Sequence, residues 1–155
     1  GKAMGGGNGG CTSGRKEIIE MLRQRSRPYL FSNTLAPATV GATLKVIEML
    51  TESDDLPAKT MENARFFRSK MEAAGFDLVP GNTAIVPVMI YDESLAIQFA
   101  DELLEEGVYV IGFCYPVVPR GKARIRVQLS AAHTTDQIDQ AVEAFIKRGK
   151  KLKII

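Results

Sequence analysis

The sequence contains few of the residues on which metal and redox chemistry depend. Only two cysteines, Cys11 and Cys114, occur in its 155 residues, and His133 is the single histidine. No Cys-x-x-Cys pair or His-Cys cluster is present, so neither a zinc site nor a disulfide framework is indicated. Free cysteines are typical of a reducing compartment, which is therefore the expected location.

Long hydrophobic runs and a strong net charge are also missing. No apolar run reaches the roughly 18 residues that span a bilayer, and no signal-peptide pattern is present. The net charge is +2 with 25% charged residues, which is neither strongly acidic nor strongly basic. The basic residues are not interleaved with stacking aromatics. We therefore expect neither a membrane nor a nucleic acid as partner.

The apolar content is that of one ordinary domain, or of a piece of a larger one. Apolar residues make up 45% of the sequence, which is enough for a single domain with a core. In the first third, residues 14–25 and 38–51 each predict a helix with an apolar stripe. The stripes consist of Ile18, Met21 and Leu22 in the first helix and Val40, Leu44 and Ile47 in the second. Between them, Pro28 and Pro37 bracket a segment that we expect to be extended or irregular.

The remaining two thirds predict three further helices. The first begins near Pro57 and ends at Gly75, the second ends at Gly107, and the third follows Thr134 as N-cap. Gln137 stands at the position that completes a capping box with Thr134. The residues predicted to face the core are Ala64, Phe67, Met71, Ala74, Ala96, Phe99, Ala100, Leu103, Ile138, Ala141, Val142 and Phe145.

Three strands are predicted in the same part, at 84–90, 108–113 and 123–129. Pro87 cannot donate a ladder hydrogen bond, so it favours an edge position or a bulge for the first strand. The third strand alternates strictly between apolar and polar side chains. Ile125, Val127 and Leu129 occupy one of its faces and Arg124, Arg126 and Gln128 the other. Residues 52–155 therefore predict a small α/β sandwich, whereas residues 1–51 lack strands and resemble the end of a larger domain.

The glycine-rich opening GKAMGGGNGG has several interpretations. Gly5, Gly7 and Gly10 match G-x-G-x-x-G, but no strand precedes them and Glu20 lies inside a predicted helix, so a dinucleotide site is not supported. A P-loop is excluded because no Gly-Lys-Ser/Thr follows. The stretch is either a flexible leader or a place where the backbone passes close to a flat ligand while Lys2 forms an imine with an aldehyde such as pyridoxal phosphate.

Longer segments carry a family resemblance. GKAMGG is similar to the lysine segment of the α-oxoamine synthases, which are fold-type-I pyridoxal-phosphate enzymes. RQRSRPYLFSNTLAP and GFCYPVVPRGKARIRVQLSAAHT also resemble segments of that family, in order and over essentially the whole chain. The resemblance implies the C-terminal portion of a fold-type-I transferase. Residues 1–51 would end the large cofactor-binding domain and include the linking helix, and residues 52–155 would form the small C-terminal α/β domain.

The resemblance also implies functional roles for four residues and a structural role for a fifth. Lys2 would hold the cofactor as an imine and then remove a proton from the substrate Cα. Ser32 and Asn33 would reach across a homodimer to the phosphate of the neighbouring subunit's cofactor, although the residues alone favour a helix cap there. Arg126 would bind the substrate carboxylate with its planar guanidinium, and Arg124 would be structural, although a solvated strand face is the simpler interpretation of both arginines.

The implied reaction condenses glycine with acetyl-CoA, releasing CoA and 2-amino-3-ketobutyrate. Alternatives are another α-oxoamine synthase, which would join a different acyl-CoA to alanine, serine or glycine, or a non-catalytic α/β binding module. The family's aspartate at the pyridine nitrogen, its ring-stacking histidine and its main phosphate loop would lie upstream of this sequence, so we expect the 155 residues to be inactive alone. The expected location is the cytoplasm, or the mitochondrial matrix in a eukaryote.

The remaining candidate residues have simpler explanations. His133 precedes a helix cap and is expected to pack or to form a turn. Cys11 and Cys114 are expected to be small packing residues rather than nucleophiles. There are two basic clusters, which consist of Arg23, Arg25 and Arg27 and of the basic residues of 147–153. Both are expected to be solvated faces, and one of them could contribute contacts to the CoA phosphates.

Overall fold

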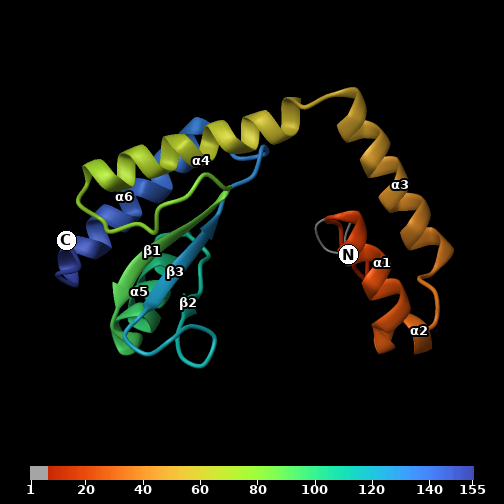
Figure 1. Ribbon diagram of the computed structural model, residues 1–155. Coiled ribbons are helices and arrows are strands. Elements are labelled where there is room, and N and C mark those ends of the chain that lie inside the picture. Colours follow the sequence, from red (N-terminus) through yellow and green to blue (C-terminus); the bar gives the residue numbers. More distant parts are fainter. Residues whose placement is uncertain (1–6) are drawn as a thin grey trace. The chain divides into compact units, whose positions relative to one another are not determined.

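The computed structural model describes residues 7–155, and its contacts divide the chain into two compact units with the boundary between Asp54 and Asp55. Figure 1 labels the elements of both units in chain order. The described elements of the first unit are helices, whereas the second unit combines helices with a sheet.

The first unit contains α1 (Lys16–Arg25), α2 (Arg27–Phe31) and α3 (Pro37–Glu52). Helices α1 and α3 confirm the two predicted helices. The prediction of an extended or irregular segment from Pro28 to Pro37 was wrong for its first half, which forms α2. The reason is that Pro28 lies in the first turn of α2, where a helix does not need its N–H group.

The apolar stripes of the first unit are not covered by other described residues. Ile18 of α1 is 53% exposed and Leu44 of α3 is 62% exposed. No residue between 7 and 54 is buried. The described part of this unit therefore has no hydrophobic core of its own, as its lack of strands led us to expect.

The second unit contains a three-stranded antiparallel sheet in the order β1-β3-β2. Its strands are β1 (Ile85–Tyr91), β2 (Gly112–Phe113) and β3 (Ala123–Gln128). Strand β1 lies at an edge of this sheet, as Pro87 predicted. Ile125 and Leu129 are buried and Arg126 is exposed, which confirms the alternation predicted for β3.

The strand predicted at 108–113 is much shorter than expected. Only Gly112 and Phe113 pair with β3. The backbone N–H of Val108 instead donates to the carbonyl of Leu103 at 2.9 Å, which holds the start of the segment at the end of the preceding helix. Gly112 brings β2 close to that helix, because a Cβ at this position would lie 2.9 Å from the carbonyl oxygen of Ala96.

The helices of the second unit are α4 (Asp55–Ala73), α5 (Glu93–Glu105) and α6 (Thr135–Lys151). Helix α4 ends before Gly75, whose φ of +95° favours glycine, and α5 ends before Gly107. The predicted capping box is present, because Thr134 Oγ1 accepts from Gln137 N at 3.2 Å and Gln137 Oε1 accepts from Thr134 N at 3.0 Å. These three helix predictions are confirmed.

The core of the second unit lies between the sheet and these helices (Figure 1). Phe145 of α6 is completely buried, and its ring meets three other phenylalanine rings edge to face. The partners are Phe67 of α4 at 5.9 Å, Phe99 of α5 at 5.4 Å and Phe76 at 6.1 Å between ring centroids. The residues predicted to face the core are buried, except that Ala74 and Ala141 are half-buried.

Candidate active site

Ser32 and Asn33 lie where α2 ends. Ser32 has extended backbone angles, and its N–H donates to the carbonyl of Pro28 at 3.0 Å, which closes the last turn. Both residues are exposed. Within the described chain, neither side chain forms a hydrogen bond, so the hydroxyl and the amide are available to a ligand. Lys2, the predicted catalytic residue, lies outside the described residues.

Arg126 lies on β3 in the second unit. Its cross-strand neighbour on β1 is Pro87, which carries no charge. Its guanidinium carbon lies over the ring of Phe113 of β2, 4.2 Å from the ring centroid. Among the described residues, no carboxylate forms an ion pair with Arg126. The planar group is therefore supported on an aromatic face while its N–H donors remain free to bind an anion.

Arg124 lies on the same face of β3 but has a different environment. Its Nε–H donates to the carbonyl of Lys122 at 3.0 Å, and the residue is half-buried. One donor of Arg124 is therefore occupied by the adjacent backbone. This difference distinguishes two arginines that sequence alternation alone places together.

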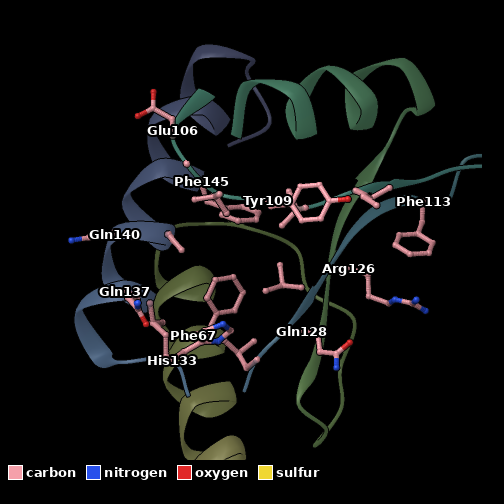
Figure 2. A pocket seen from close by; sticks show the side chains of 18 residues that line it. Phe67, Glu106, Tyr109, Phe113, Arg126, Gln128, His133, Gln137, Gln140 and Phe145 are labelled. Atoms are coloured by element: carbon pink, nitrogen blue, oxygen red, sulfur yellow. The ribbon is translucent and has the colours of Figure 1, made fainter. Parts of the chain in front are cut away.

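A cavity of about 800 Å³ opens beside Arg126. Its lining comes mainly from residues 106–111, the second half of β3 and the first half of α6. In this lining, residues 108–111 do not pair with β3. Figure 2 shows Arg126 and Phe113 together on one side of this cavity and His133 and Gln137 on the other. Phe67 and Phe145 contribute apolar surface between them.

His133 has the structural role that was expected. Its Nδ1 accepts a hydrogen bond from the N–H of Ser130 at 3.2 Å. The carbonyls of Ser130 and His133 both accept from the buried amide of Asn63, each at 2.9 Å. This turn connects β3 to α6. Asn63 was not among the predicted residues, because nothing in its local sequence indicates a partner about 70 positions away.

The two cysteines differ in their surroundings. The Cys114 thiol lies 3.6 Å from the carbonyl oxygen of Glu93. Burial raises the pKa of Cys114, and the negative charges of Glu93 and Asp92 raise it further. A thiol with a raised pKa is a poor nucleophile at neutral pH, which agrees with the packing role expected for it. Cys11 is exposed, so no such role is found for it among the described residues.

The prediction of a solvated basic face at 147–153 was wrong in part. Arg148, whose side chain is 14% exposed, contacts Glu102 at 3.1 Å, Glu105 at 3.2 Å and Glu106 at 2.6 Å. Lys147 contacts Glu106 at 2.7 Å and Lys151 contacts Glu102 at 2.9 Å. These charges hold α6 against α5. The sequence did not indicate this because the partners lie more than 40 positions apart in the chain.

Both central carboxylates of this charge cluster are stabilised in the ionised form. Hydrogen bonds from Lys151 and then from Arg148 lower the pKa of Glu102 against the opposing effect of burial. Hydrogen bonds from Lys147 and Arg148 likewise lower the pKa of Glu106. The pKa values of both carboxyl groups are lower in the folded chain than the usual 4.5. Their ion pairs therefore stabilise the fold above that pH, and this stabilisation is lost as the pH falls through the folded-state pKa values.

Replacing Glu102 by glutamine should therefore lower the thermal unfolding midpoint by a few degrees near neutral pH. The difference from the parent should shrink as the pH falls below about 4.5, because both proteins then lack the charge. Thermal scans of the two proteins across pH measure this. A difference of constant size at every pH would contradict a role based on the charge.

The chain belongs to the aminotransferase class I and II family, whose model matches residues 1–145. It resembles the C-terminal part of 2-amino-3-ketobutyrate coenzyme A ligase. It is 58% identical over 155 residues to the protein of that name from Escherichia coli strain K12, covering 100% of this chain and 39% of the relative. The mitochondrial protein of that name from Mus musculus is 53% identical over 150 residues, covering 97% of this chain and 36% of the relative.

Proteins with other names are also similar. The 8-amino-7-oxononanoate synthase of Thermosipho melanesiensis is 47% identical over 147 residues, covering 95% of this chain and 38% of the relative. A serine palmitoyltransferase structure from S. paucimobilis with a bound PLP-myriocin aldimine has a TM-score of 0.81 and 30% identity, covering 88% of this chain and 35% of that chain. The predicted fold, the C-terminal portion of a PLP-dependent α/β transferase, is confirmed.

Three findings concern the cofactor, metal binding and membrane-spanning helices. The family and the similar solved structure with bound PLP imply pyridoxal phosphate as the cofactor. Ser32 and Asn33 fit this cofactor, because their free hydrogen-bond donors suit phosphate oxygens. In the part of the chain that the structure describes, no group of three His, Cys, Asp or Glu residues is arranged to hold a metal. None of the described helices is both long enough and apolar enough to span a membrane.

Proposed function

We propose that this chain is the C-terminal part of a pyridoxal-phosphate-dependent acyltransferase that joins glycine to acetyl-CoA. The products are 2-amino-3-ketobutyrate and CoA. The observation that carries the proposal is the environment of Arg126, a guanidinium that rests on Phe113 and has no acidic partner among the described residues. Such a group suits the carboxylate of an amino acid. The chain spans about two fifths of the length of its E. coli relative, so the activity belongs to a longer protein.

Each proposed site residue has a separate task. Arg126 binds the glycine carboxylate and thereby orients the Cα–H bond, and Lys2 accepts the proton from Cα. Ser32 and Asn33 donate hydrogen bonds to the cofactor phosphate of the neighbouring subunit in a homodimer. When bound, pyridoxal phosphate supplies an electron sink for the developing carbanion. A carbon–carbon bond then forms between Cα and the acetyl carbonyl carbon, the thioester bond breaks, and CoA leaves as the thiol.

The choice of glycine and acetyl-CoA rests on the comparisons. The identity to the E. coli 2-amino-3-ketobutyrate coenzyme A ligase is 58%, against 47% to the oxononanoate synthase. That synthase is the second candidate, because 47% identity over nearly the whole chain is also high. We propose that the protein works in the cytoplasm, or in the mitochondrial matrix of a eukaryote, where free thiols such as Cys11 and Cys114 persist.

The reaction is tested with the full-length, cofactor-loaded protein that contains this chain. We expect CoA release from glycine plus acetyl-CoA to exceed that from alanine or serine with longer acyl-CoAs by about tenfold or more in kcat/KM. The free thiol is measured over time, and glycine alone should change the visible absorption band of the cofactor. Preference for alanine with a longer acyl-CoA would assign the protein to the second candidate. No turnover and no spectral change would favour a non-catalytic binding module.

A further inference from the structure

Phe113 is the side chain that supports Arg126. Because Phe113 pairs directly with Arg124 across β2 and β3, Arg126 stands two positions further along on the same face. Diagonal neighbours of this kind are within reach of an aromatic ring and a long side chain. The distance of 4.2 Å from the guanidinium carbon to the ring centroid lies well inside the range of a cation–π contact.

The kind of contact matters for an arginine that must bind a carboxylate. A glutamate or aspartate partner would occupy the N–H donors at the edge of the guanidinium and would compete with the substrate. The face of an aromatic ring attracts the cation without accepting any of those hydrogen bonds in its plane. Phe113 can therefore restrict the rotamers of Arg126 while leaving the donors free.

The ring of Phe113 is itself held in place. It is half-buried, and the preceding Gly112 packs against the backbone of α5 so closely that a Cβ would meet the Ala96 carbonyl. Gly112 also pairs with Ile125, which is completely buried. Although β2 has only two residues, both pair with β3 and Gly112 also packs against α5. The ring therefore has a defined position from which to support Arg126.

We propose that Phe113 is a positioning residue that pre-organises Arg126 for the substrate carboxylate. This inference rests on the proposed function, because it assumes that Arg126 binds that carboxylate. A pre-organised guanidinium loses less conformational entropy when the substrate binds. Phe113 therefore contributes to glycine binding and does not contribute to proton removal from Cα.

The test uses Phe113→Leu and Phe113→Tyr in the full-length, cofactor-loaded protein. Leucine keeps an apolar side chain but removes the ring, so we expect the glycine KM to rise about two- to fivefold, with kcat within about twofold of the parent. Tyrosine keeps the ring face, and the glycine KM should stay near that of the parent. If the leucine variant does not fold, Phe113→Met tests the same loss of the ring, because the methionine side chain is flexible and fills space well.

Two controls separate positioning from a general structural effect. In an Arg126→Ala background, Phe113→Leu should no longer change the glycine KM, because the residue it positions is absent. Phe66→Leu removes another cation–π contact, which lies on α4. In this contact the Nζ atom of Lys70 lies 4.8 Å from the centroid of the Phe66 ring. That variant should leave the glycine KM unchanged.

The outcomes distinguish this inference from the proposed function. If Arg126→Ala raises the glycine KM but Phe113→Leu and Phe113→Met do not, Phe113 is not a positioning residue and the role of Arg126 stands. If Arg126→Ala leaves the glycine KM unchanged, both the carboxylate assignment and the inference are wrong. An equal effect of Phe113→Leu with and without Arg126 would identify Phe113 as structural only.

Discussion

Replacing Arg126 by alanine should raise the glycine KM about 100-fold in the full-length, cofactor-loaded enzyme, because removal of one member of a hydrogen-bonded charge pair costs several kcal/mol. The Arg126 side chain is exposed, so truncation leaves no cavity in the core. The visible absorbance of the bound cofactor should therefore be nearly unchanged. Steady-state kinetics against glycine concentration, together with an absorption spectrum, measure both quantities.

Two further variants make this result specific. Arg126→Lys keeps the charge but loses the bidentate geometry, so its glycine KM should lie between those of the parent and the alanine variant. Arg124→Ala removes the neighbouring guanidinium, which is bonded to the Lys122 carbonyl, and should have little effect on the glycine KM. Unchanged glycine kinetics for Arg126→Ala would contradict the assignment and make Arg124 the next residue to test.

Replacing Phe145 by alanine should lower the local free energy of unfolding of the second unit by about 3 to 5 kcal/mol. Phe145 is completely buried, and it contacts the rings of Phe67, Phe76 and Phe99. Alanine would leave a cavity where α4, α5 and α6 meet. Amide hydrogen exchange in α6 and β3, read by mass spectrometry, should become about 100-fold faster or more, because it reports this local opening.

Phe145→Leu is the matched comparison for this core position. Leucine refills most of the space but loses the edge-to-face ring contacts, so we expect a clearly smaller acceleration of exchange than with alanine. Exchange in the first unit, residues 7–54, should stay the same in both variants, since Phe145 has its ring contacts within residues 55–155. Equal exchange rates in parent and alanine variant would show that this cluster does not hold the unit together.

Local sequence patterns predicted most elements of the second unit. The capping box of Thr134 and Gln137 placed the start of α6, because its two hydrogen bonds join residues three positions apart. Gly75 and Gly107 marked helix ends through their positive φ angles. Alternation placed Ile125 and Arg126 on opposite faces of β3, because a strand has a period of two residues.

The predictions that failed depended on contacts distant in sequence. The apolar run 108–113 has strand character throughout, but only Gly112 and Phe113 pair with β3, since Val108 bonds to the end of α5 instead. The basic residues of 147–153 were expected to be solvated, but the Arg148 side chain is only 14% exposed and is paired with carboxylates of α5 and Glu106. Local patterns missed these pairs because the partners lie more than 40 positions away in the chain. The short helix α2 was missed because a proline within a first helical turn can also begin a break.

The sequence by itself determined the family of this protein and its periodic elements, because both are encoded in local patterns and in ordered motifs along the chain. It nominated Lys2, Ser32, Asn33 and Arg126 through resemblance, and these roles stay predictions. Tertiary structure alone decided which arginine of β3 has free donors, which ring lies against it and which carboxylates hold α6. Those features arise from strand register and helix packing, which bring together residues that no local pattern connects.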